Sequence, residues 1–327
     1  MELVKKLDEK NIQDVLKKNF VKLMPAFYEM QSSFLSGVYK RYGDLEGGHI
    51  VIFFARNLHL KVLRKREIDL NFDLSLDRFW HNHKGVLQEK QRVVSVSNFT
   101  GLPKETARRK IIYLIKSKHI KKNEKNKLYW EPASDLKETY ISIIEEQIKS
   151  LSRFIFEQTK FLNMNLSFVK IEKEIKNNYS FHWFHYLDFQ LQYMKFWQKN
   201  IRDLESLLII LQPFIRTFTF LKSNNPILPS LDSVFLKKIS SNELIKSANV
   251  SATSISEITG IPRATCIRKL ESFVRQKVLA KDPQTKRYYL TLDKLSDFPD
   301  LYSENNMKNT INIFSRFSSI LLRTMTK

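Results

Sequence analysis

Apolar side chains recur at helical spacing through most of this chain. Two segments have apolar residues at positions i, i+4, i+7 and i+8: Ala107, Ile111, Leu114 and Ile115 in one, and Cys266, Leu270, Phe273 and Val274 in the other. This spacing places apolar groups on one face of an amphipathic helix. Longer runs with apolar residues about every seven positions predict a helix near 135–165 and another near 305–325. With 7 glycines and 9 prolines in 327 residues, the pattern predicts a mainly α-helical fold.

The residues before and after these two amphipathic segments predict a compact motif. Val96 to Thr100 would form a short helix, and Gly101 supplies the positive φ of a tight turn between two helices. Pro103 suits the first turn of the next helix, where its missing N–H is not needed. Each amphipathic helix is followed by a segment with a turn-like middle and aromatic residues on its return side, 119–132 and 278–291. We interpret each such segment as a two-stranded wing.

The motif occurs twice because the sequence contains an internal duplication. Ser254 to Lys269 matches Ser95 to Lys110 without a gap, 159 residues further along, with eight of sixteen positions identical. The same offset pairs Asp44-Leu45-Glu46 with Asp203-Leu204-Glu205, and we expect one ungapped register from about residue 40 to about 162. Self-similarity at a fixed offset over this length indicates a tandem duplication.

The duplication predicts the domain organisation. We expect an N-terminal arm at 1–19, a first repeat at 20–175 and a second at 176–327, with residues 163–180 joining the copies. Each repeat would contain a helical region, a winged helix and a C-terminal helix. The winged helices are expected at about 75–132 and 234–292, and the C-terminal helices at about 135–165 and 305–325. The predicted fold is therefore two tandem winged helix-turn-helix units with small β wings, flanked by helical segments, in a single-chain pseudo-dimer.

The charge distribution indicates a polyanionic partner. The chain has 55 Lys and Arg against 34 Asp and Glu, a net charge of +21. Residues 104–127 have a net charge of +8 and residues 263–287 a net charge of +6, so two-thirds of the excess lies in the two motifs. Such a concentration is typical of a surface that releases counterions from a phosphate backbone.

The motif also resembles a known family. Residues 254–270, SISEITGIPRATCIRKL, are similar to the core of bacterial winged helix-turn-helix regulators of the IclR and MarR type. The resemblance covers about 45 residues in each copy and does not extend to the helical regions. It implies that the helix after the Gly-x-Pro turn lies in the major groove, with the wing against the backbone or minor groove. We therefore expect a sequence-specific regulator of transcription that binds double-stranded DNA.

Candidate DNA-binding residues follow from the helical wheel and the wings. Arg109 and Arg268 are the most outward positions and are expected at bases or adjacent phosphates. The full set is Lys104, Glu105, Thr106, Arg108, Arg109, Lys110, Lys116, Lys121, Lys122, Lys125, Lys127, Arg263, Ala264, Thr265, Ile267, Arg268, Lys269, Arg275, Lys281, Lys286 and Arg287. The two recognition surfaces differ, since Glu105 and Arg108 correspond to Ala264 and Ile267. We expect two unlike half-sites.

Other functions have weaker sequence support. The sequence has no phosphate loop, nucleophile elbow or zinc-type cysteine spacing, so we expect no enzyme, no metal and no cofactor. His182, His185 and Asp188 could approach a metal, but their aromatic surroundings favour core packing. The lone Cys266 is expected in a core. A replication initiator with two winged helices is the first alternative, and a chromosome-organising winged-helix adaptor is the second.

Partners and location are predicted from the same features. The beginning MELVKKLDEKN has no apolar core, and the apolar stretch 207–221 is short for a bilayer and contains Pro213 and Arg216. We expect a cytoplasmic, nucleoid-associated protein that does not contact a membrane. RNA polymerase and a second copy of the chain stay open as further partners, and a small-molecule effector has no support in the sequence.

Overall fold

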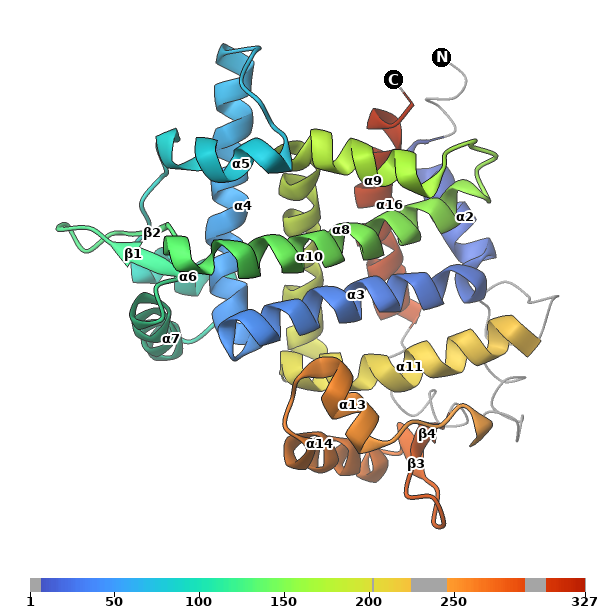
Figure 1. Ribbon diagram of the computed structural model, residues 1–327. Helices are drawn as coiled ribbons and strands as arrows, with labels where there is room; N and C mark the ends of the chain where they lie inside the picture. Colours follow the sequence, from blue (N-terminus) through green and yellow to red (C-terminus); the bar gives the residue numbers. More distant parts are fainter. Residues whose placement is uncertain (1–6, 202, 225–245, 292–303, 327) are drawn as a thin grey trace.

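The computed structural model describes residues 7–201, 203–224, 246–291 and 304–326. Over these residues the fold is mainly α-helical, with two small antiparallel two-stranded sheets (Figure 1). The first half contains α2 (Glu9–Lys18), α3 (Phe20–Tyr42), α4 (Leu45–Ile68), α5 (Leu76–Asn82), α6 (Val93–Thr100), α7 (Lys104–Lys116), β1 (Ile120–Lys122), β2 (Leu128–Trp130) and α8 (Lys137–Thr159). The second half contains α9 (Phe168–Asn177), α10 (Tyr179–Ile201), α11 (Leu204–Asn224), α13 (Ala252–Thr259), α14 (Arg263–Arg275), β3 (Leu279–Lys281), β4 (Tyr288–Leu290) and α16 (Glu304–Thr324).

Several elements recur at the offset found in the sequence. Helices α9, α10, α13 and α14 and strand β3 begin and end 159 residues after α2, α3, α6, α7 and β1. The correspondence therefore begins at residue 9, earlier than the sequence comparison predicted. It also corrects two expectations. Residues 9–18 form a helix with Ile12 and Leu16 buried rather than an arm, and most of the expected joining segment is helix α9.

The register is not ungapped throughout, as the two small sheets demonstrate. In the first sheet Ile120 pairs with Trp130, whereas in the second Leu279 pairs with Leu290. The connection between the strands is thus one residue longer in the second copy. This insertion lies in a surface turn, where loop length changes at little cost in stability.

The long helices form two layers that cross each other, and each layer combines both halves of the chain. One layer runs in the order α9, α8, α3, α11, and the other in the order α2, α16, α10, α4 (Figure 1). In this order every helix of one layer corresponds to one of the other, with α16 in the place of α8. Since α4 packs on α10 and α11 packs on α3, the two halves share one core and are not separate domains.

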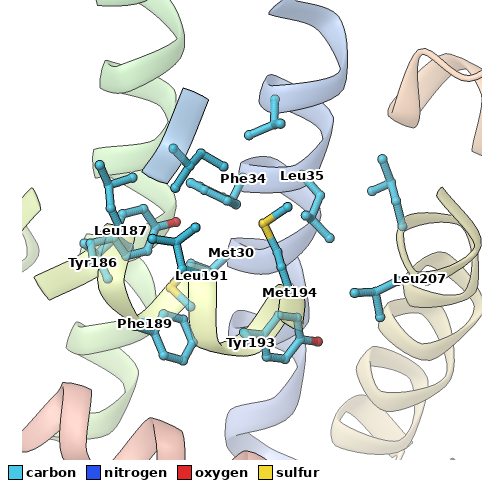
Figure 2. Close-up of a cluster of buried hydrophobic side chains, with 14 of the residues drawn as sticks. Met30, Phe34, Leu35, Tyr186, Leu187, Phe189, Leu191, Tyr193, Met194 and Leu207 are labelled. Atoms are coloured by element: carbon cyan, nitrogen blue, oxygen red, sulfur yellow. The ribbon is translucent and has the colours of Figure 1, made fainter. Parts of the chain in front are cut away.

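Aromatic pairs at the crossing of α3 and α10 follow the same correspondence. The rings of Phe34 and Tyr186 lie 5.4 Å apart, and those of Phe27 and Tyr193 lie 5.8 Å apart, both edge to face. Phe27 and Phe34 each precede their partner's neighbour by the repeat offset, because Tyr186 corresponds to Phe27 and Tyr193 to Phe34. Exchanging the two halves therefore exchanges the two contacts. Figure 2 shows Phe34, Tyr186 and Tyr193 in this cluster of buried side chains.

Helix α11 is long and apolar enough to cross a membrane by length and composition. In the structure 72% of its most apolar window is buried, and it packs along α3 in the core. Its hydrophobicity is thus accounted for by packing between the two halves.

Candidate nucleic-acid interface

The first copy of the duplicated motif folds as two helices joined by a tight turn. We call residues 93–130, comprising α6, α7, β1 and β2, the first unit. Gly101 adopts a left-handed conformation with φ of 73°, which glycine reaches without steric cost. The Thr100 hydroxyl donates to the Val96 carbonyl at 2.8 Å, and the Ser97 hydroxyl donates across the turn to the Leu102 carbonyl at 2.7 Å. These bonds fix the angle at which α7 leaves the turn.

The second copy repeats this turn atom for atom. We call residues 252–290, comprising α13, α14, β3 and β4, the second unit. Gly260 has φ of 76°, the Thr259 hydroxyl donates to Ile255 at 2.7 Å, and the Ser256 hydroxyl donates to Ile261 at 2.7 Å. The Ser, Thr and Gly identities found in the sequence are therefore explained by the geometry of the turn.

Each small sheet gains a further bridge that the sequence did not predict. Gln91 pairs with Leu128 in the first unit, and Val250 pairs with Tyr288 in the second. Both bridges come just before the first helix of their unit. They attach the beginning of each unit to its own wing, so each unit is closed on itself.

The apolar faces of α7 and α14 are buried as predicted. Ala107, Ile111 and Leu114 are buried on α7, as are Leu270 and Phe273 on α14. The lone cysteine, Cys266, is completely buried, its thiol donates to the Ile261 carbonyl at 3.5 Å, and burial raises its pKa. A raised pKa disfavours the reactive thiolate, and the core position predicted for this cysteine is confirmed.

Most of the predicted DNA-binding side chains are exposed. The exposed residues are Lys104, Glu105, Arg108, Arg109, Lys116, Lys121, Lys122, Lys125, Arg263, Ala264, Arg268, Arg275, Lys286 and Arg287. Thr106, Lys110, Lys127, Thr265, Ile267 and Lys281 are partly exposed. Arg109 and Arg268 occupy equivalent positions, and neither forms an ion pair with any described residue. Their guanidinium groups are thus available to an external anion.

Lys110 and Lys269 do not fit the role expected from the sequence. Lys269 is only 8% exposed, and its ammonium lies 2.6 Å from Asp203 Oδ1 and 3.5 Å from Glu205 Oε2. Lys110 lies 3.0 Å from Asp44 Oδ1 and 3.4 Å from Glu46 Oε2. Both lysines point from the second helix of their unit towards the helical layers, so we remove them from the DNA-binding set.

The aspartates that receive these lysines also cap the long helices α4 and α11. Asp44 Oδ1 accepts from the Gly47 N–H at 2.6 Å, and Asp203 Oδ1 accepts from the Ser206 N–H at 2.8 Å. One carboxylate therefore stabilises a helix N-terminus and holds a unit against the layers. The sequence contained this signal, because the Asp-Leu-Glu triplet and the lysine are identical in both copies at one offset.

The basic residues of the two wings differ in their partners. Lys121 pairs with Glu131, and Lys281 pairs with Glu271 at 2.7 Å. Lys122, Lys125 and Lys286 are exposed and form no ion pair with described residues. Wing lysines with a carboxylate partner already have their charge balanced, whereas the others present an unbalanced charge to solvent.

The outer stripe of α7 contains an apolar residue that the sequence analysis missed. Ile112 is 52% exposed and lies one turn beyond Arg109 on the way to Lys116. Its counterpart on α14 is Glu271, which accepts hydrogen bonds from Lys281 and from the Tyr288 hydroxyl. On the same stripe Glu105 pairs with Arg108 at 2.7 Å. The two outer faces are therefore chemically different.

Both units contact the segment where α3 ends and α4 begins. Asp44 and Glu46 hold Lys110 of the first unit. A Cβ at Gly260, in the turn of the second unit, would lie 3.4 Å from Cγ of Lys40. The two units consequently occupy neighbouring corners of the molecule (Figure 1), with their spacing set by helices α3 and α4.

A metal centre finds no support among the described residues. No group of three or more histidine, cysteine, aspartate or glutamate side chains lies close enough there to hold an ion. His182 is buried beside Glu174, with Nε2 3.4 Å from Oε1, and Asp188 pairs with Arg56 at 2.9 Å. The histidine cluster noticed in the sequence is part of the packed core in these residues.

Comparison with family models, with curated proteins and with solved structures found no match to this chain.

Proposed function

We propose that the chain is a sequence-specific double-stranded DNA-binding regulator of transcription, in which the first and second units are winged helix-turn-helix modules. Helix α7 and helix α14 would each enter the major groove of one duplex. The main support is that the same exposed basic helix occurs twice, after the same turn, on halves that correspond throughout the two layers. A two-fold arrangement of recognition helices matches two successive grooves of B-form DNA.

Electrostatics supports a phosphate backbone as the partner. The exposed basic residues concentrate on α7, α14 and the two wings, where the sequence places two-thirds of the excess positive charge. Each neutralised phosphate releases counterions, so such a surface binds DNA strongly at low salt and loses affinity as salt rises. Lys122, Lys125 and Lys286, which lack an internal partner, are best suited to this role.

Sequence preference would come from the outer stripes of α7 and α14. Arg109 and Arg268 can each donate two hydrogen bonds to a guanine, the commonest specific contact in the major groove. Ile112 can touch a thymine methyl group, whereas its counterpart Glu271 is held by Lys281 and Tyr288. These differences support two unlike half-sites recognised by one polypeptide.

The two layers would act as a rigid spacer between the modules. Since each layer contains helices of both halves, neither module can move away from the other without disturbing the shared core. The ion pairs of Lys110 and Lys269 attach each module to the beginning of a long helix. Fixed spacing lowers the entropy that binding to two half-sites would otherwise cost.

Selection from a pool of random duplex DNA tests this function. Wild-type protein should enrich a motif of two unlike half-sites, and Arg109→Ala and Arg268→Ala should each lower affinity for that motif by about 5- to 150-fold, which corresponds to about 1–3 kcal/mol. Arg64→Ala is the matched control, because Arg64 is an exposed arginine in the last third of α4. Failure to enrich any motif would refute the proposal, and mapping bound sites relative to promoters tests the regulatory part.

A further inference from the structure

A small cavity lies beneath the first unit, where the two layers meet. Its volume is about 40 Å³, and it is enclosed mainly by aromatic side chains of α3, α4, α8 and α10 and of strand β2. The residues that matter for its chemistry are Arg41, His59, Trp130, Tyr140, Tyr179 and Trp183. A space of this size accommodates a few water-sized groups.

Arg41 brings a positive charge to this cavity without a balancing carboxylate. Its guanidinium contacts are long, 3.5 Å from Nη2 to the Tyr140 carbonyl and 3.4 Å from Nη1 to the Tyr42 hydroxyl. Its Nε is buried and makes no hydrogen bond, and the group stacks 4.2 Å from the ring centre of Tyr140. Among the described residues no aspartate or glutamate pairs with it. A guanidinium in low-polarity surroundings is stabilised most by an anion.

The other polar groups around the cavity reinforce this preference. His59 is 2% exposed and its Nδ1 makes no hydrogen bond. Burial lowers the pKa of His59 to about 3, so the ring is neutral at physiological pH and one nitrogen can donate. Burial, together with the nearby Arg41, lowers the pKa of His119 to about 4. The cavity is therefore positive through Arg41 alone, with a neutral donor beside it.

We propose that this cavity binds a small monovalent anion, of the size of formate or chloride, between Arg41 and His59. The anion would pair with the guanidinium and fill a space that the surrounding rings leave open. The second half lacks the same chemistry, because the counterparts of Arg41 and His59 are Asn200 and Phe218. One anion would bind per chain, and it would bind at the first unit only.

The position of the cavity links the anion to the first unit. Trp130 lies on β2, in the wing of that unit, and the register places Leu290 at the equivalent position of the second unit. An anion among Arg41, Tyr140 and Trp130 would join the wing to α3 and α8 by contacts that the second unit does not have. The inference concerns anion binding by the protein alone and does not depend on DNA binding.

Thermal unfolding in matched salts tests the inference. Full-length protein is melted at constant sodium concentration and pH while formate or chloride replaces gluconate, an anion too large for the cavity. We expect the wild-type melting temperature to rise in a saturable manner with formate or chloride. Arg41→Met should abolish the rise, and Arg64→Met, which removes an exposed arginine of α4, should retain it.

A second variant separates loss of the site from loss of folding. Ala55 lines the cavity, so Ala55→Leu should fill the space while keeping Arg41, and it should also abolish the formate-dependent rise. Equal melting of the wild type in gluconate, formate and chloride would overturn the inference. A rise that Arg41→Met retains would overturn it as well, because it would place the anion on the basic surface.

Discussion

The ammonium of Lys269 lies 2.6 Å from Oδ1 of Asp203, and the equivalent Lys110 lies 3.0 Å from Oδ1 of Asp44. Both aspartates cap a long core helix and both lysines belong to the outward-facing helix of a unit. A single ion pair thus joins the surface that we propose for DNA binding to the layers that set its position, once in each copy.

Lys269→Met should destabilise the protein by about 1–3 kcal/mol, because it removes the partner of a partly buried carboxylate. Asp203 keeps 42% of its side-chain exposure, so water replaces part of the lost interaction. Lys110→Met should cost about 1 kcal/mol, since Lys110 is more exposed than Lys269. Urea unfolding measures both, with Lys116→Met as an exposed control expected to change stability by less than about 0.5 kcal/mol. Equal effects of all three variants would contradict the assignment.

The same ion pair predicts a pH dependence. Burial opposes ionisation of Asp203, but hydrogen bonds from Lys269 and Ser206 outweigh it and hold the pKa of this carboxyl below its ordinary value of 3.8. A depressed pKa contributes stability that is fully present above the unfolded-state pKa and is lost as pH falls through the folded-state pKa. The stability difference between wild type and Lys269→Met should therefore be constant from pH 7 to about 5 and shrink below about 4. In an Asp203→Asn background the lysine substitution should show no such trend.

Two neighbouring lysines of the first wing should differ in their effect on DNA binding. Lys122 is exposed and unpaired among the described residues, whereas Lys121 pairs with Glu131. Lys122→Ala should reduce the slope of log affinity against log salt by about 0.9, and Lys121→Ala should reduce it by less. Fluorescence anisotropy with the selected duplex at several salt concentrations measures the slopes. If Lys121→Ala had the larger effect, the division of the wing lysines would be incorrect.

Glu105→Ala should alter the sequence preference of the first half-site alone. Glu105 holds Arg108 at 2.7 Å, and alanine is the residue found at the equivalent position 264. Removing the carboxylate frees Arg108 to contact a base or a phosphate, and each changed base contact is worth about 1–3 kcal/mol of discrimination. Repeating the DNA selection with this variant should change one half-site and leave the other unchanged. A change in both half-sites would disprove separate recognition.

The two halves should not fold independently. Because α4 packs on α10 and α11 packs on α3, residues 1–165 alone would expose the faces that those partners cover. We expect this fragment to aggregate or to self-associate, and we expect it to form a 1:1 complex when co-expressed with residues 166–327. Light scattering coupled to size exclusion measures the masses. A folded monomer of residues 1–165 would contradict the exchange of helices between the halves.

Much of the local structure could be predicted from sequence. The Ser-x-x-Thr-Gly-x-Pro pattern indicated the helix, the turn and the next helix, because each residue has one physical role there. Amphipathic spacing identified the buried face of α7 and the core position of Cys266, because a helical period alone determines which side is apolar. These features depend on residues that are close together in the chain.

What the sequence analysis missed depends on contacts between distant segments. The charge of Lys269 suggested a phosphate contact, but its neighbour in space, Asp203, lies 66 residues earlier in the chain. The exchange of helices between layers, the role of α2 and the cavity at Arg41 likewise arise from packing of both halves together. Helical periodicity does not specify which amphipathic faces meet.

Hydroxyl-radical footprinting of the selected duplex measures the central claim most directly. The account predicts two protected patches on one DNA molecule about one helical turn apart, with one patch weakened in Arg109→Ala and the other in Arg268→Ala. A single protected patch, or loss of the same patch in both variants, would contradict the binding of two unlike half-sites by one chain.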